Sequence, residues 1–487
     1  MTDPAEASDA LDRPGVGGKA IRGGLIRVGG YGAGVVLALI SAPLLLRHLG
    51  VEDFGGYVAV TSLITVVALV ADLGMTVLAV REYAVEDRAG RLRLVGLVVW
   101  IRIVVAVIGG ALAVGFAAAA GYDEALIAGV ALAAVGMVIA LVQQSFTIPL
   151  VADLRMGTVT ALDLVSKVLV VVGMVALVLL GAGVTAFLAL SIPVGLVVAA
   201  ATIVAARGSL GGRVRLSGAG ARKMIRQTLP FAAGSMLANL FYRVPILMMS
   251  VISTAKETGY FSASFRVIDV VLPIPSLITA TAFPILARAA AGDEARLGYA
   301  LQRLCEIGLL LGGLVILGFL VGAEPIIDFL GGEAFAPSIP VLRIQGAAIA
   351  ATFLFAVWAA GLWAIHAQRS IVVASLVGLV CVSALTALLV PPHGAIGAAV
   401  AMTVSEVVLA ATAGILLTRR RPSLRPRLFI ALKVGVAVGC GLVPWALGVP
   451  DLAATVLGVL VYAGVVLLLR AVPRDVFDAL RSRGEPV

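Results

Sequence analysis

The stretch of sequence that decides the fold is residues 94–118, LVGLVVWIRIVVAVIGGALAVGFAA, an apolar run interrupted by one charged residue, Arg102. A helix of about 17–25 such residues crosses a hydrocarbon core about 30 Å thick. Soluble core helices are shorter and amphipathic, so a soluble bundle explains this run poorly. The sequence therefore predicts an all-α polytopic membrane protein with 14 transmembrane helices. The fourteen runs lie near 27–46, 56–80, 94–118, 125–148, 161–180, 184–205, 227–252, 261–286, 301–321, 339–361, 370–390, 395–417, 429–448 and 453–471.

The distribution of basic residues between these runs predicts the orientation. Most of the 36 Lys and Arg residues lie at the two termini and in the gaps after even-numbered runs, whereas the opposite gaps hold Arg47 and Lys256. Cytoplasmic loops carry the cationic excess, so we expect a multi-pass cell-membrane protein with both termini in the cytoplasm. The net charge of +9 then reflects topology and contact with anionic lipids. A nucleic-acid partner is not expected, because the basic residues are dispersed along the chain.

Composition argues against a soluble domain or a metal site. Hydrophobic residues make up 61% of the 487 residues and charged ones 13%. The N-terminal tail, residues 1–25, is small and polar and is predicted to be disordered, and residues 472–487 form a short cytoplasmic tail. The three cysteines lie within apolar runs and the three histidines at the ends of runs, with no metal-ligand spacing. We therefore expect neither a metal nor a cofactor.

An internal repeat divides the chain into two halves. Residues 43–57 read PLLLRHLGVEDFGGY and residues 245–260 read PILMMSVISTAKETGY, each passing from an odd-numbered run into an even-numbered one. Both halves then begin in the cytoplasm, as in transporters built from two parallel repeats. The predicted domains are an N-lobe (26–206), a basic cytoplasmic linker (207–226), a C-lobe (227–418) and two accessory spans (419–471).

The first copy of this repeat resembles a known family. The segment 47–57, RHLGVEDFGGY, followed by Asp72-Leu73-Gly74 and Arg81, looks like the N-terminal signature of polysaccharide flippases. These form the Wzx-like branch of a superfamily that also contains multidrug and toxin extrusion antiporters and the lipid II flippase.

A second motif late in the chain supports the resemblance. Residues 394–399, GAIGAA, followed by Ser405-Glu406, are similar to the family's Gly-x-x-Gly-Ala-Ala stretch. The resemblance covers about 25–420 by organisation. It implies two six-helix lobes around a central cavity and alternating access. The implied cargo is a polyprenyl-diphosphate-linked oligosaccharide that moves from the cytoplasmic to the outer leaflet, and polysaccharide polymerase and glycosyltransferases are the implied partners.

Three other functions stay open at this stage. A lipid II flippase and a small-molecule antiporter belong to the same superfamily. A membrane glycosyltransferase is a rival from another class, because Glu52-Asp53 is an acidic pair in the first external loop. That loop is too short to build an acceptor site, so we do not expect an enzyme.

The charged residues inside the apolar runs are the candidate binding residues, because each is costly in lipid unless it is paired or faces water. Arg243 has no evident partner, and Ser235, Asn239 and Tyr242 form a polar stripe beside it on the seventh run. A guanidinium is always charged and can bind a diphosphate bidentately. We therefore predict that Arg243 and its stripe line the cavity.

Three further arginines are candidates for which a structural role is the alternative. Arg102 either lines the cavity or extends to the cytoplasmic interface. Arg266 either binds cargo or is neutralised by Asp269, which lies three residues away on the same helix face. Arg27, at the cytoplasmic end of the first run, either receives a headgroup early or only sets topology.

Two carboxylates inside the runs, Asp72 and Glu406, have no obvious partner in the sequence and are candidates for cation coupling. A buried carboxylate can load and release a proton as its surroundings alternate. Asp72 could equally hydrogen-bond helix ends around Gly74.

Overall fold

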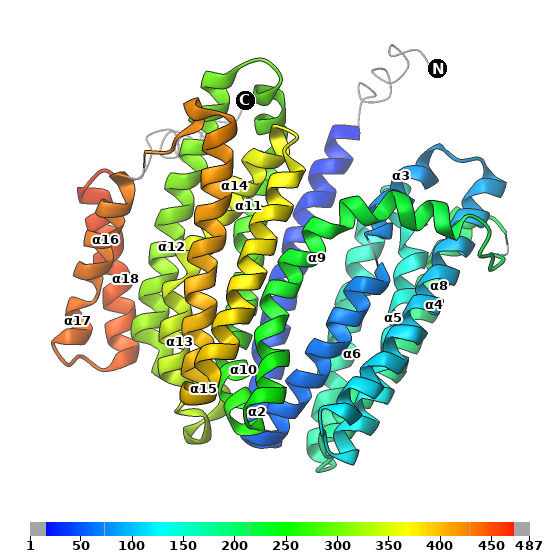
Figure 1. Cartoon of the computed structure of the whole chain (residues 1–487), viewed down its shortest axis with the longest axis horizontal. Coiled ribbons are helices and arrows are strands. Elements are labelled where there is room, and N and C mark those ends of the chain that lie inside the picture. Colours follow the sequence, from blue (N-terminus) through cyan, green and yellow to red (C-terminus); the bar gives the residue numbers. More distant parts are fainter. Residues whose placement is uncertain (1–15, 73, 213, 428, 472–487) are drawn as a thin grey trace. The chain divides into compact units, whose positions relative to one another are not determined.

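The computed structural model describes residues 16–72, 74–212, 214–427 and 429–471, and within these ranges it is helical without a strand (Figure 1). Helices are expected, because a backbone in lipid must satisfy its own hydrogen bonds. Within the described residues, eleven helices are long and apolar enough to cross a membrane by length and composition. The all-α, multi-pass prediction is confirmed.

The number of fourteen spans stays a prediction, because some helices are continuous where the sequence predicts two spans. Helix α2 (Val16–Asp72) and helix α15 (Gln368–Arg420) each contain one glycine with non-helical dihedral angles. These glycines are Gly50, with φ 71°, and Gly394, with φ 52°. Glycine is the residue that adopts positive φ readily, so each marks a sharp turn between two predicted spans.

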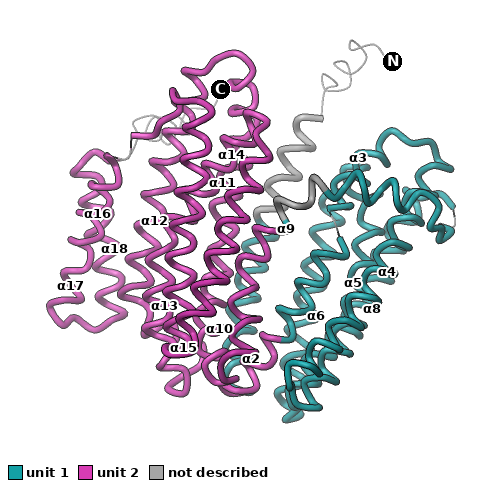
Figure 2. Tube along the Cα trace, viewed as in Figure 1, with its two compact units in different colours: residues 1–49, 60–236 teal, residues 50–59, 237–487 magenta. Residues whose placement is uncertain are grey.

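The chain divides into two compact units (Figure 2). Unit 1 consists of the described residues up to Leu49 together with Val60–Met236, and unit 2 of Gly50–Ala59 with the described residues from Leu237 onward. Helix α2 therefore contributes to both units, and helix α9 (Ala221–Ile252) is divided between them. Of the predicted N-terminal tail, residues 1–25, the first fifteen residues lie outside the described residues, and helix α2 begins at Val16. Residues 472–487 lie outside them as well.

Unit 1 is a bundle in which buried apolar side chains come from all of its long helices. Tyr83, which is fully buried, donates a hydrogen bond to the carbonyl of Ser209 at 3.0 Å. Aspartate side chains cap two helix starts: Asp87 accepts from a backbone amide of α4 and Asp123 from one of α5, each at 2.7 Å. Its remaining helices are α3 (Met75–Val85), α4 (Arg88–Ala119), α5 (Glu124–Ala152), α6 (Met156–Leu179), α7 (Val184–Ala189) and α8 (Ser191–Leu210).

Unit 2 contains the other helices, and its last part packs on α12. Helices α16 and α18 both contact α12, and the Tyr462 hydroxyl donates to the carbonyl of Leu310 at 2.6 Å. The helices are α10 (Ala255–Val271), α11 (Pro273–Ala290), α12 (Glu294–Gly331), α13 (Ser338–Ala347), α14 (Ile349–Ala364), α15, α16 (Phe429–Gly441), α17 (Val443–Ala446) and α18 (Asp451–Leu468), with 3-10 turns η1 (Glu333–Phe335) and η2 (Pro422–Leu424).

The two copies of the internal repeat pack against each other inside unit 2. A Cβ atom at Gly55 would overlap the carbonyl of Ala255, and one at Gly259 would overlap the carbonyl of Val51. The backbones therefore approach so closely that only glycine fits at these two positions. The Glu257 carboxylate beside them accepts the backbone N–H of Ala395 at 2.7 Å. This contact anchors the second part of α15 just after its turn.

Candidate functional site

A buried ion pair lies among α2, α3, α4 and α5 in unit 1. The Arg102 side chain is fully buried and donates hydrogen bonds to Asp72, to the Thr76 hydroxyl at 2.6 Å and to the Ser145 hydroxyl at 2.9 Å. It also donates to the carbonyl of Leu141 at 3.4 Å. The side chain of Asp72 is 29% exposed, so one end of the pair is accessible.

This pair corrects the sequence interpretation, in which Asp72 had no obvious partner and Arg102 was not paired with it. The two residues belong to different helices, and spacing along one helix cannot reveal such a contact. The guanidinium of Arg102 is held by Asp72, Thr76 and Ser145, and its side chain does not reach the surface of unit 1. Of its polar atoms, Nε has no hydrogen-bond partner among the described residues. The carboxylate offsets the cost of the buried cation, so Arg102 binds Asp72 in this conformation.

The second charged cluster lies in unit 2, where α9 meets α10. Arg243 is 27% exposed, and its Nη1 lies 3.5 Å from Oδ2 of Asp269, which is 25% exposed. The Arg243 guanidinium also lies 5.7 Å from the centre of the Phe265 ring, a cation–π geometry. The interpretation of Arg243 as unpaired is therefore wrong.

Asp269 has a second cation nearby, since Arg266 also acts electrostatically on its carboxylate. Arg266 also acts electrostatically on the hydroxyl of Tyr57. The cluster of Arg243, Arg266 and Asp269 thus carries two positive charges and one negative charge. A net positive charge at half-buried side chains is suited to an anionic ligand.

A third group joins a pocket to a buried carboxylate in unit 2. Glu406 on α15 is 3% exposed and accepts a hydrogen bond from the Thr352 hydroxyl at 2.6 Å. The Tyr242 hydroxyl interacts with both groups. Glu406 therefore has partners, contrary to the sequence interpretation. Because Tyr242 and Thr352 also line the pocket, two hydroxyl groups connect Glu406 to its interior.

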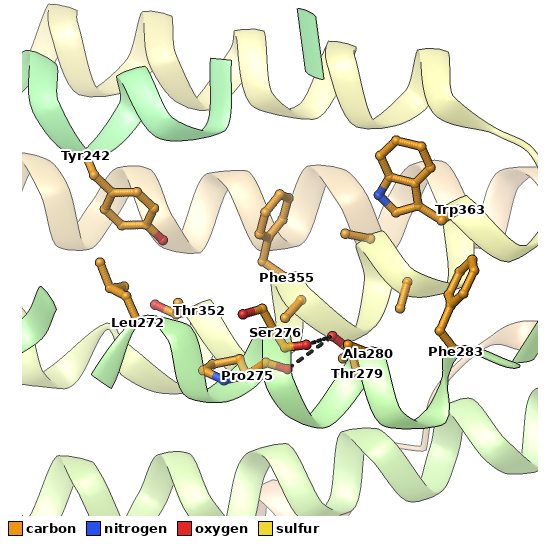
Figure 3. A pocket seen from close by; sticks show the side chains of 13 residues that line it. Tyr242, Leu272, Pro275, Ser276, Thr279, Ala280, Phe283, Thr352, Phe355 and Trp363 are labelled. Carbon is orange, nitrogen blue, oxygen red and sulfur yellow. Dashed lines mark hydrogen bonds between the residues drawn. The ribbon is translucent and has the colours of Figure 1, made fainter. Parts of the chain in front are cut away.

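This pocket is mainly apolar and has a volume of about 340 Å³. Figure 3 shows Tyr242 at one end and Trp363 at the other, with Phe355 between them. The hydroxyl of Thr279, on the α11 wall, donates to the carbonyls of Pro275 and Ser276, so it has no spare proton for a ligand. The pocket therefore offers aromatic surface and hydrogen-bond acceptors.

The remaining predicted site residues are placed only in part. Asn239 is exposed on α9, one turn before Arg243. The side chains of Ser235 and Arg27 lie outside the described residues. The sequence interpretation missed Thr76, Ser145 and Thr352, which complete the two networks. A hydroxyl-bearing residue within an apolar run was the signal that could have indicated them.

Comparison with known proteins identifies the family of the chain. A profile of the family described as "Polysaccharide biosynthesis protein" matches residues 44–340. The chain belongs to this family. The resemblance predicted from residues 47–57 is therefore confirmed, and no curated protein matches the chain at the level of sequence.

Solved structures show the same fold. The chain is similar to the lipid II flippase MurJ in an inward closed conformation, with a TM-score of 0.75 and 12% identity over 93% of this chain and 99% of that one. It is also similar to an inward-facing MATE family multidrug resistance transporter, with a TM-score of 0.63 and 14% identity over 80% and 95% of the two chains. A MOP superfamily transporter from Pyrococcus furiosus matches with a TM-score of 0.57 and 14% identity over 84% and 96%. The fold is thus that of MOP superfamily transporters.

Proposed function

We propose that this protein is a flippase that moves a polyprenyl-diphosphate-linked oligosaccharide from the cytoplasmic to the outer leaflet of the cell membrane. Membership of the polysaccharide biosynthesis family supports the process, and the MOP fold supports alternating access between two lobes. The observation that carries the proposal is the cluster of Arg243, Arg266 and Asp269, with its net positive charge and its partial exposure. In this proposal both termini are cytoplasmic, and a polymerase and glycosyltransferases are the partners.

Arg243 is proposed to hold the cargo diphosphate. Asp269 keeps the guanidinium in place while the site is empty, and the 3.5 Å separation is longer than a normal charge-assisted hydrogen bond. A diphosphate carries more charge than one carboxylate and can bind the planar guanidinium at two oxygens. We infer that it displaces Asp269 from Arg243 when the cargo enters.

Glu406 and Asp72 are proposed to couple transport to a cation. Glu406 connects to the pocket through Tyr242 and Thr352, so a proton can pass between them without exposing the carboxylate. Asp72 pairs with Arg102 in unit 1, so a cation or proton bound there competes with the guanidinium. At both sites, a change in the charge of the carboxylate would therefore alter a contact between two helices.

A lipid II flippase is the second candidate, because the MurJ fold extends over 93% of this chain. Deletion of the gene separates the two candidates. A polysaccharide flippase predicts that lipid-linked oligosaccharide accumulates in the cytoplasmic leaflet while peptidoglycan synthesis continues. Accumulation of lipid II alone would contradict the proposal.

The role of Arg243 is tested by matched substitutions. Arg243→Ala should abolish transport while the protein stays in the membrane, and Arg243→Lys should retain part of it, because the charge is kept and the planar fork is lost. Asp269→Asn should retain cargo binding. The control is Arg343→Ala, which removes another arginine of unit 2 that donates to the carbonyl of Leu320 at 3.0 Å. If Arg243→Ala and Asp269→Asn lose transport activity to the same extent, the ion pair has a purely structural role.

The orientation is tested by cysteine labelling in a variant whose native cysteines are replaced. A cysteine at position 123 should react with an impermeant reagent from outside, and one at position 215 only after the membrane is opened. The opposite pattern would reverse the predicted topology.

A further inference from the structure

A second pocket in unit 2 lies between the start of α12 and the loop that connects α15 to α16, described at residues 421–427. Its volume is about 560 Å³, and more of its lining is polar than in the pocket beside Tyr242. Gln302 and Tyr299 of α12 form one side, and Arg425 and Arg427 of the loop form the other. The buried side chain of Trp358 contributes apolar surface.

The loop is held in place by several polar contacts with α12. Gln302 donates to the carbonyl of Arg427 at 3.0 Å and accepts the backbone N–H of Arg427 at 2.8 Å. At the other end of the loop, Ser423 donates to Glu294 at 2.5 Å, and Arg421 lies 3.5 Å from the same carboxylate. The pocket is thus preorganised, and a ligand would not need to order this loop.

Among the described residues, the two acidic side chains near this pocket are paired with other arginines, and two arginines of the loop have no partner. Glu294 is matched by Arg421, and Glu306 by Arg303 at 2.7 Å. The guanidinium groups of Arg425 and Arg427 have no hydrogen bond or ion pair with any described residue, and both residues are exposed. Two guanidinium groups beside one pocket, both without a partner among the described residues, favour a ligand with several negatively charged oxygens.

The surroundings indicate that this ligand is a lipid. Helix α16 begins directly after the loop with Phe429, which is 68% exposed, and continues with Leu432, which is 64% exposed. Large apolar side chains with that exposure face acyl chains in a membrane protein, while the adjacent arginines lie at headgroup level. The basic loop belongs to the cytoplasmic side by the distribution of Lys and Arg. This last step rests on the orientation in the proposed function.

We propose that this pocket binds the phosphate-bearing headgroup of an anionic phospholipid of the cytoplasmic leaflet, held by Arg425 and Arg427. The acyl chains lie along the exposed face of α16. Because α16 and α18 pack on α12, a headgroup that contacts both the loop and α12 fastens the last helices to the rest of unit 2. The lipid therefore stabilises this junction and is distinct from the transported cargo.

The test uses the purified full-length protein and native mass spectrometry with phosphatidylglycerol or phosphatidylcholine. The protein should retain phosphatidylglycerol in preference to phosphatidylcholine. Each arginine near a membrane surface contributes about fivefold to anionic-lipid binding, so Arg425→Ala/Arg427→Ala should weaken retention about 25-fold. Arg369→Ala is the control, because it removes an exposed arginine of unit 2 that does not line the pocket. It should bind phosphatidylglycerol like the original protein.

A steric variant tests the pocket without changing its charge. Gly298 lines the pocket, and a Cβ atom there would meet Leu424 at an ordinary 3.6 Å. Gly298→Phe should fill the space and displace phosphatidylglycerol while the fold persists. Unchanged retention in either pocket variant would overturn the proposal. Displacement of the lipid by equimolar inorganic diphosphate would also overturn it, because the site would then recognise the cargo's phosphates. The Arg243→Ala variant should lose flipping but still bind phosphatidylglycerol. This result would show that the lipid site and the proposed cargo site are independent.

Discussion

Replacing Arg102 by methionine tests whether the buried pair in unit 1 stabilises the fold. Methionine keeps most of the side-chain length but removes the bonds to Asp72, Thr76 and Ser145. Removing one partner of a buried ion pair costs about 3–5 kcal/mol, because the remaining charge is uncompensated. Asp72 is 29% exposed and keeps some solvation, so we expect the lower end, about 3 kcal/mol.

A double-mutant cycle isolates the interaction of the two charges. Asp72→Asn should cost more, about 5 kcal/mol by the same reasoning, since the cation that remains, Arg102, is fully buried and keeps its neutral partners only. The double variant should cost about 3 kcal/mol, which is less than the two losses added together, because no uncompensated charge remains. Denaturant unfolding in detergent micelles, followed by helix content, gives the four free energies of unfolding. A coupling energy below about 0.5 kcal/mol would refute a stabilising role for the pair.

Three further predictions concern unit 2. Gly55→Ala should lower the stability by about 1–3 kcal/mol in the same unfolding assay, because the new Cβ overlaps the carbonyl of Ala255, whereas Gly435→Ala, which has open space, should not. Tyr462→Phe should cost about 1 kcal/mol and loosen α18 from α12, detected as faster amide hydrogen exchange in α18; unchanged exchange would contradict this. Glu406→Gln should remove the dependence of flipping on the cation gradient in vesicles while cargo still binds, and gradient-dependent flipping in this variant would exclude Glu406 from coupling.

The arrangement of charges within unit 2 could be predicted only in part. The sequence indicated Arg243, Asp269 and Glu406 because charged residues in apolar runs are costly, and the structure places all three against polar or aromatic partners. It could not assign those partners. Arg266 is spaced to share a helix face with Asp269, yet Arg243 from another helix makes the ion pair that the structure shows.

By itself the sequence determined the helical character, the membrane class and the family. The hydrogen bonds of a helix are local and lipid leaves a spanning chain few other conformations, so an apolar run of sufficient length is decisive. Only the tertiary structure decided which helices meet, and therefore that Arg102 binds Asp72 and that Glu406 reaches a pocket through Tyr242 and Thr352. These contacts depend on how helices far apart in the chain are rotated and packed against each other. The spacing of residues within one segment of the sequence carries no information about that packing.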